Sequence, residues 1–316
     1  MTENSLSRLS RANAVLESWG PWPYMALTLS MLFFASNHIL GRLVPGEVPP
    51  IGLSLWRWVV ATLVILPLTW REIARSYKLI LGHWKYFVVM TFCLVVLGNT
   101  TIYIALHYTT AINGGMVAMV QPVVTMCIAW VLFRELVTRW QVVGAIIAAA
   151  GVMTILTRGD LAVLTGVRFN IGDLWMMSSV IGFSFYAVLL REAPRDISPL
   201  AFLNVTQFLG IVILIPFYWW ETVNILPTSL NTTTVISVLW AGIIVAVGAL
   251  GLWNIGNRLI GASKASAFIY VRVLMITGLA MVFLDETLEL YHFPAFVLII
   301  GGVYLVSAAK RKKQGA

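Results

Sequence analysis

The sequence predicts an all-α membrane protein with ten transmembrane helices, arranged as two inverted repeats of five helices each. Three observations lead to this prediction: an apolar composition, matching residues in the two halves of the chain, and cations concentrated on one side. Hydrophobic residues make up 59% of the 316 residues and charged residues only 11%, against about a quarter charged in soluble domains. We therefore expect lipid to be the solvent of this chain.

Ten segments are long and apolar enough to cross a membrane, which takes about 20 apolar residues per helix. Many of these segments are joined by short turns. Residues 1–20 are polar and are expected to form an N-terminal tail, with no cleavable leader. The expected spans are 22–43, 51–70, 84–105, 112–132, 140–157, 171–190, 199–220, 234–256, 263–284 and 292–309.

The two halves of the chain carry matching residues at nearly constant offsets. The pairs are Pro50 with Pro199, Pro67 with Pro216 and Arg42 with Arg191 at 149 residues, and Ala111 with Ala262, Glu135 with Glu286 and Gly151 with Gly302 at 151. Five spans per half is an odd number, so the second half enters the membrane with opposite topology. Inverted repeats of this kind are typical of secondary transporters. The expected divisions are a first repeat over 1–157, a connecting loop over 158–170, a second repeat over 171–309 and a basic tail over 310–316.

The cations lie mostly on one side of the predicted membrane. With the N-terminus inside, cytoplasmic segments hold 16 of the 21 lysines and arginines, whereas the opposite side holds only Arg42, Arg158 and Arg168. This asymmetry follows the positive-inside rule and predicts that both chain ends are cytoplasmic. The formal net charge of +8 is thus explained by the lipid bilayer, and no nucleic-acid partner is expected.

The two remaining cations, Arg57 and Arg272, lie several residues inside predicted spans. An ionisable residue at such depth is costly and indicates a functional site. Arg57 is expected to act as a structural clamp on backbone carbonyls of neighbouring helices. Arg272 lies nearer the middle of its span and has two interpretations, either a clamp or a bidentate contact with a substrate carboxylate.

His38 is the only histidine deep in a span, and it lies beside Asn37. It is either an interhelical hydrogen-bonded tie or a cavity residue, since a neutral imidazole can bind a polar group or relay a proton. None of the 13 acidic residues lies mid-span, although a proton-driven antiporter usually needs a buried carboxylate. The sequence therefore favours a facilitative carrier, with proton coupling through His38 as the alternative.

Spans three and eight are expected to face a cavity between the repeats. Asn99, Tyr103 and His107 recur every four residues and share one helical face. At the 151-residue offset, Tyr103 matches Asn254 in span eight. Flat amphipathic rings around such a cavity suit a planar, partly apolar solute, although tryptophan and tyrosine also form interfacial belts. The expected substrate-binding residues are Asn37, His38, Trp56, Asn99, Tyr103, Gln121, Trp175, Tyr186, Trp253, Asn254, Tyr270 and Arg272.

Gln121-Pro122 interrupts span four near its middle, where proline removes a backbone donor and bends the helix. The bend either moves during access switching or is a static packing kink. In the second half, Arg272 and Val273 take the places of these residues. Spans five and ten carry small residues that permit close helix packing in lipid, so we expect them to be scaffold or a dimer face, in a monomer or weak homodimer.

Other classes of protein lack support in the sequence. A membrane enzyme needs a cluster of acids, a metal set or a nucleophile–base pair, whereas the acids and the four histidines are scattered. Cys93 and Cys127 lie inside spans and are expected to be packing residues without a metal framework. No nucleotide-binding motif is present. We expect no catalytic residue, no metal and no cofactor, and transport of a small molecule.

Several segments together are similar to a known family. They are Pro50 with Leu55-Trp56-Arg57-Trp58, the run Tyr103-Ile104-Ala105-Leu106-His107-Tyr108-Thr109-Thr110-Ala111, Gln121-Pro122-Val123, Glu135, the glycine-bearing fifth span and Gly172-Asp173. In this order they resemble the EamA-type branch of the drug/metabolite transporter superfamily over nearly the full chain. The chain looks most like the bacterial aromatic amino-acid exporters of that branch.

The resemblance implies an exporter in the bacterial inner membrane that moves aromatic or other neutral amino acids, and related small metabolites, by alternating access. It also implies a central cavity walled by spans one, three, four, six, eight and nine, with spans five and ten at the periphery. Arg272 or His38 would then bind the substrate carboxylate. Members of this branch differ in substrate on similar scaffolds, so the alternative is a broad exporter of drugs or purine metabolites, proton-coupled through His38.

Overall fold

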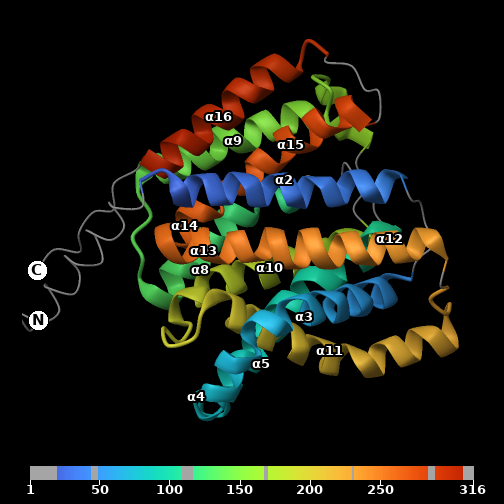
Figure 1. Cartoon of the computed structure of the whole chain (residues 1–316). Coiled ribbons are helices and arrows are strands. Elements are labelled where there is room, and N and C mark those ends of the chain that lie inside the picture. The colour runs from blue at the N-terminus through green and yellow to red at the C-terminus, as the bar shows by residue number, and fades with distance from the viewer. Residues whose placement is uncertain are drawn as a thin grey trace, which may run out of the picture.

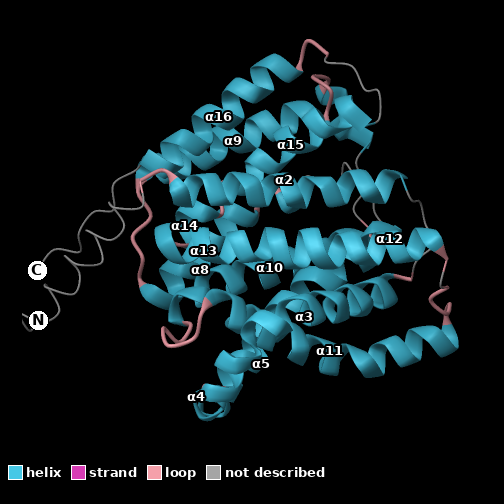
Figure 2. Ribbon diagram, viewed as in Figure 1, coloured by secondary structure: helices cyan, strands magenta, loops and turns pink. Residues whose placement is uncertain are grey.

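A computed structural model describes residues 20–43, 49–108, 117–166, 170–229, 231–283 and 289–308. These residues form helices joined by turns and loops, and no strand occurs among them (Figure 2). The predicted all-α class is confirmed for this part of the chain. The predicted basic tail, Glu286 and most of the predicted N-terminal tail lie outside the described residues.

The helices follow one another along the chain with short connections. In the first half they are α2 (Trp22–Leu43), α3 (Pro50–Arg75), α4 (Tyr77–Gly82), α5 (Trp84–Thr91), the π-helical η1 (Phe92–Thr100), α6 (Thr101–Tyr108), α8 (Gln121–Phe133) and α9 (Arg139–Leu156). In the second half they are η2 (Leu161–Gly166), α10 (Ile171–Leu189), η3 (Leu190–Glu192), α11 (Pro199–Asn224), α12 (Thr232–Trp240), the π-helical η4 (Ala241–Ala249), α13 (Leu250–Ile260), α14 (Ala262–Ala265), α15 (Phe268–Phe283) and α16 (His292–Ala308).

Seven continuous helical stretches among the described residues are long and apolar enough to cross a membrane. They are Pro50–Arg75, Trp84–Ala105, Arg139–Leu156, Ile171–Glu192, Pro199–Asn224, Thr232–Ile260 and Ala262–Phe283. The helices α8 and α16 are apolar but shorter, and α2 has the same bounds as the first predicted span. The chain is therefore a polytopic membrane protein in class, while ten spans remain a prediction.

The helices pack in pairs that join the two halves of the chain. The helix α3 lies along α11, and α9 lies along α16 at one edge of the bundle (Figure 1). In the middle of the bundle, α2 packs against η4, α13 and α15, and α10 packs against η1, α6 and α8. The two central helices α2 and α10 thus each pack against three elements of the opposite half, and they bring the walls of a central site together.

Two glutamates cap the paired helices α3 and α11 reciprocally. The buried carboxylate of Glu221, near the end of α11, accepts the backbone N–H groups of Ile51 at 3.0 Å and Gly52 at 2.7 Å, at the start of α3. The carboxylate of Glu72, near the end of α3, accepts the N–H and the hydroxyl of Ser198, the N-cap of α11. A carboxylate at a helix N-terminus satisfies free N–H groups and opposes the helix dipole. These caps link α3 and α11 at both ends of the antiparallel pair.

The helices α9 and α16 approach each other closely at glycines. A Cβ added to Gly302 would lie 2.5 Å from the carbonyl oxygen of Gly144, and one added to Gly144 would lie 2.6 Å from the carbonyl oxygen of Gly302. Small residues at such crossings let helix backbones meet in lipid. Neighbouring Gly301 has nothing within 4 Å of the added Cβ, so the contact is confined to one face of α16.

Replacing Gly302 by valine is expected to separate α9 from α16 and to lower the unfolding temperature in detergent. Overpacking a close contact costs about 1–3 kcal/mol. Gly301→Val introduces the same side chain on the same helix without a clash, so its unfolding temperature should match that of the wild type. Equal stability of the two variants would show that this helix contact does not stabilise the fold.

Candidate functional site

A cavity lies between the two halves of the chain. Its volume is about 80 Å³, several times the space that one water molecule needs. The residues that line it come from seven of the predicted spans. They are Met31, Phe34 and Asn37 of α2, Arg57 of α3, Asn99 of η1, Ile102 and Tyr103 of α6, Gln121 of α8, Phe183 of α10, Val245 of η4, Leu250 and Trp253 of α13, and Ile269 and Arg272 of α15.

The walls of the cavity include all six spans that the resemblance implied, together with Arg57 from span two. The helices α9 and α16 contribute no described residue to the lining. Six of the twelve expected substrate-binding residues line this cavity: Asn37, Asn99, Tyr103, Gln121, Trp253 and Arg272. Their role in binding substrate stays a prediction, but the fold brings them together around one space.

Arg57 is fully buried, 1% exposed, and is held by neutral partners. It donates from Nη1 to the Tyr103 hydroxyl at 2.5 Å and from Nη2 to Asn99 Oδ1 at 2.8 Å. Its guanidinium also lies over the Trp58 ring, 4.3 Å from the centroid, a favourable cation–π arrangement. The clamp that we expected from the sequence therefore acts on side chains rather than on the backbone carbonyls that we expected.

The π-helical segment η1 sets the position of Asn99. Its amide nitrogen donates to the carbonyl of Leu94, five residues earlier, at 2.7 Å, and the Thr100 hydroxyl donates to Val95 at the same spacing. A π-helical turn leaves backbone groups for side chains to satisfy, and such turns are frequent at functional sites. The Asn99 amide is thereby fixed with its oxygen toward Arg57.

Arg272 differs from Arg57 in its contacts. The buried Nε–H groups of both arginines lack a partner among the described residues, but only Arg57 donates from its Nη atoms to neighbouring side chains, and Arg272 lines the cavity. Gln121, its counterpart at the 151-residue offset, lines the same cavity. The carbonyl oxygen of Gln121 accepts the Thr125 hydroxyl at 2.8 Å, which fixes the backbone at the start of α8. Both side chains are thus available to a solute.

Five of the expected substrate-binding residues lie away from the cavity lining: Trp56, Trp175, Tyr186, Asn254 and Tyr270. Tyr186 is fully buried and donates to Asn254 Oδ1 at 3.0 Å, which ties α10 to α13. Trp56 is 38% exposed and donates to the Tyr218 hydroxyl of α11 at 3.3 Å. Trp175 is equally exposed, on the first turns of α10.

Tyr270 and His38 are the last two of the expected substrate-binding residues. Tyr270 is outside the cavity lining and donates to the carbonyl of Met119 at 3.0 Å. His38 lies in α2, but its side chain is outside the described part of the structure. Its predicted role in substrate binding or proton coupling therefore stays a prediction.

Pro122 lies at a helix start rather than in a helix interior. The residues before it form a turn, and α8 begins at Gln121 with Pro122 in its first turn. Proline is well tolerated there because its missing N–H would be unpaired in any case. The Tyr270 hydroxyl satisfies the carbonyl of Met119 just before this start, as a free carbonyl at membrane depth requires. Span four is therefore interrupted at the cavity, and the Tyr270 hydroxyl pairs with a backbone carbonyl at the interruption.

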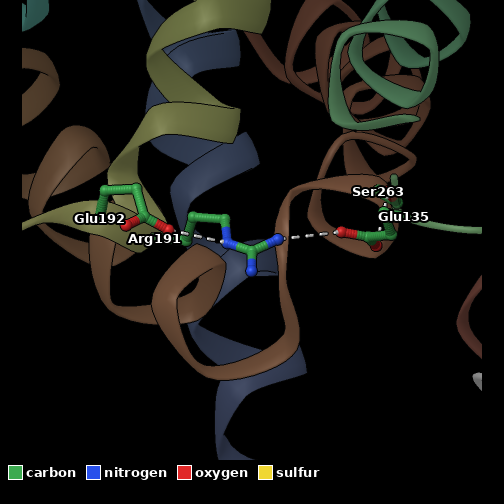
Figure 3. A network of polar contacts seen from close by, with 4 residues as sticks. All are labelled: Glu135, Arg191, Glu192 and Ser263. Atoms are coloured by element: carbon green, nitrogen blue, oxygen red, sulfur yellow. Dashed lines mark hydrogen bonds and ion pairs between the residues drawn. The ribbon is translucent and has the colours of Figure 1, made fainter. Parts of the chain in front are cut away.

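Beyond the cavity, polar contacts join helices at one end of the bundle, and those of Glu135 link the two halves. Asn257 of α13 donates to the carbonyl of Ala187 at 3.0 Å. Farther out, Arg191 of η3 forms an ion pair with Glu135, after α8, at 3.7 Å, and Ser263 of α14 donates to the same carboxylate at 3.0 Å (Figure 3). These contacts join the ends of spans four, six and nine.

Arg191 also pairs with Glu192 on its own element at 3.3 Å (Figure 3). The sequence pattern matched Glu135 with Glu286 and did not pair it with Arg191. Both residues belong to matched pairs at offsets 149 and 151, but those pairs do not indicate a contact between Glu135 and Arg191.

Comparison with known proteins gives relatives over nearly the whole chain. "Uncharacterized transporter YetK" of Bacillus subtilis is 24% identical over 98% of this chain and 94% of its own length. "Uncharacterized transporter YyaM" of the same organism is 24% identical over 91% of this chain and 94% of its own length. A solved crystal structure superposes with a TM-score of 0.75 at 18% identity, covering 90% of this chain and 96% of that chain, which shows the shared fold.

The model of the EamA-like transporter family matches this chain twice, over residues 21–157 and 170–308. The two matches cover most of the sequence and contain every residue of the cavity lining. From the all-helical membrane fold, the cavity between the halves and these matches, we conclude that the chain belongs to the EamA-like transporter family of the drug/metabolite transporter superfamily.

Proposed function

We propose that this protein exports aromatic or other neutral amino acids, and related small metabolites, across the bacterial inner membrane by alternating access without proton coupling. The observation that carries the proposal is the cavity between the two halves, which combines polar groups with the flat ring of Trp253. A planar ring with one polar atom suits an amino acid with an apolar side chain. Among the described lining residues there is no carboxylate to exchange protons.

The proposal includes ten spans in two inverted repeats, and the packing supports this arrangement. The contacts of α2 with η4, α13 and α15 repeat as the contacts of α10 with η1, α6 and α8. The two π-helical segments, η1 and η4, begin 149 residues apart. The capping glutamates Glu72 and Glu221 are separated by the same 149 residues. Repeats related in this way supply two interchangeable arrangements of one bundle.

The positive-inside rule orients the bundle with both chain ends in the cytoplasm. In this orientation the contacts around Glu135, Arg191 and Asn257 lie on the cytoplasmic side of the cavity. The described conformation is then closed to the cytoplasm. The Tyr186–Asn254 hydrogen bond adds a further closure next to the cavity. Transport requires these contacts to separate when the opposite side closes.

The test is efflux of phenylalanine, tryptophan and threonine from sealed liposomes that contain the purified protein, with and without an imposed pH gradient. Efflux that the gradient does not change supports the proposal. Gradient-dependent efflux would reject transport without proton coupling and would favour coupling through His38. Efflux of planar drugs or purine metabolites, without any amino-acid efflux, would replace the amino-acid assignment by the broad-specificity alternative.

A further inference from the structure

The charges around the cavity are of one sign. Arg57 and Arg272 both line it, and no aspartate or glutamate belongs to its described lining. A guanidinium stays protonated under all ordinary conditions, so the cavity has two positive charges within the membrane. An unpaired charge at this depth is costly, and a cationic solute would increase that cost. The cavity is therefore built for a solute that brings negative charge.

The two arginines differ in the contacts that they make around the cavity. The Nη1 and Nη2 atoms of Arg57 already donate to Tyr103 and Asn99, and Trp58 covers one face of its guanidinium. These partners are neutral, so Arg57 contributes positive potential while its position is fixed. Its buried Nε–H also lacks a partner among the described residues, so the engaged Nη1 and Nη2 atoms are what distinguish Arg57 from Arg272.

Arg272 has no hydrogen bond to any described residue, and its buried Nε–H is unpaired. Its planar fork of donors matches the two oxygens of a carboxylate. Gln121 lines the cavity with it and offers an amide donor from the opposite half of the chain. Phe34, Phe183 and Trp253 line the same space with aromatic surface. The site thus combines an anion-binding fork with an aromatic wall.

We propose that Arg272 binds the carboxylate of the transported solute and that the substrate class is small solutes with one carboxylate attached to an apolar or aromatic body. This inference rests on the proposed function as a carrier, and it adds that the carboxylate is required whereas an amino group is not. Gln121 supports the carboxylate from the other half, so binding the solute links the two halves across the cavity.

The test measures equilibrium binding of four probes to the purified protein in detergent, independently of transport. Phenylalanine and 3-phenylpropionate carry the carboxylate, while phenylalaninamide and 2-phenylethylamine lack it. We expect the two carboxylates to bind and the other two probes to bind at least about thirty-fold more weakly, as loss of a buried charge partner requires. Arg272→Gln should weaken both carboxylates by a similar factor, and Arg272→Lys by less, because lysine keeps the charge without the fork.

Arg158→Gln is the matched control, because Arg158 is exposed at a turn away from the cavity, and it should leave binding unchanged. Equal binding of phenylalanine and 2-phenylethylamine to the wild type would overturn the inference without any variant. Unchanged carboxylate binding in a folded Arg272→Gln protein, or no binding of either carboxylate, would also overturn it. Binding of 3-phenylpropionate through Arg272 without amino-acid binding or efflux would support the inference and reject the amino-acid assignment.

Discussion

Replacing Asn99 by leucine is expected to destabilise the protein by about 1.5–3 kcal/mol, the contribution of a hydrogen bond to a charged group. Leucine has nearly the shape of asparagine, so packing changes little. Arg57, however, would lose its acceptor at 2.8 Å while it remains buried, and the Leu94 carbonyl would lose its donor. The measurement is the thermal unfolding curve of the purified protein in detergent.

The double variant Arg57→Leu with Asn99→Leu provides the control. It removes the buried charge together with its partner, and such paired replacement is often neutral or stabilising. We therefore expect the double variant to be more stable than Asn99→Leu alone. Tyr103→Phe, which removes one hydroxyl from the same cluster, should cost less than Asn99→Leu. If the double variant is as unstable as the sum of the two single variants, the residues do not act as one unit.

Replacing Glu221 by alanine is expected to cost about 3 kcal/mol or more, because two buried N–H groups at the start of α3 lose a charged acceptor. Hydrogen bonds to charged groups contribute about 1.5–3 kcal/mol each. The carboxylate is 1% exposed and binds Ile51 and Gly52 at 3.0 and 2.7 Å. The same unfolding curves measure this loss.

The counterpart Glu72 supplies a comparison within one chain. Its contacts with Ser198 are partly buried, so water can replace the carboxylate in Glu72→Ala and the loss of stability should be smaller. Glu221→Gln keeps one carbonyl acceptor and should lie between the wild type and Glu221→Ala. Equal effects of Glu72→Ala and Glu221→Ala would show that burial does not set the strength of these caps.

Much of the fold could be predicted from the sequence because helix length and composition determine what can cross a membrane. The first predicted span has the bounds of α2. The sixth predicted span begins at the first residue of α10, Ile171, where Asp173 forms a capping box with Asn170. The cap by Glu221 was missed, although Glu72 and Glu221 stand at the repeat offset of 149 residues, because a cap on a distant helix has no local signal.

The site was harder to predict, because a sequence gives the depth of a residue in the membrane better than its direction. Trp56 and Arg57 are adjacent, so on a helix they point about 100° apart. Arg57 lines the cavity while Trp56 contacts α11. Tyr186 has the correct depth but bonds to Asn254 instead of lining the cavity. The π-helical segments also change the register of the residues that follow them, which a regular period of 3.6 cannot anticipate.

Access to the cavity from the two faces of the membrane tests the central claim most directly. Two cysteine reporters, Ile102→Cys in the cavity lining and Ser266→Cys at the closed end, would be placed in a background with serine at Cys93 and Cys127. Ser266 is fully buried, and Ile102 lines the cavity. Membrane-impermeant thiol reagents would be added to right-side-out and to inside-out vesicles.

We expect Ile102→Cys to react from the outer face and Ser266→Cys to be protected. Arg191→Ala removes the ion pair with Glu135 that joins the halves, and exposed ion pairs contribute about 0.2–1 kcal/mol, so labelling should change up to a few-fold. Ser266→Cys should then gain reactivity from the cytoplasmic face while Ile102→Cys loses it from the outer face. Glu192→Gln, which leaves the Arg191–Glu135 pair intact, should change neither. Reporters that change independently of each other, or that both react at once from opposite faces, would contradict alternating access.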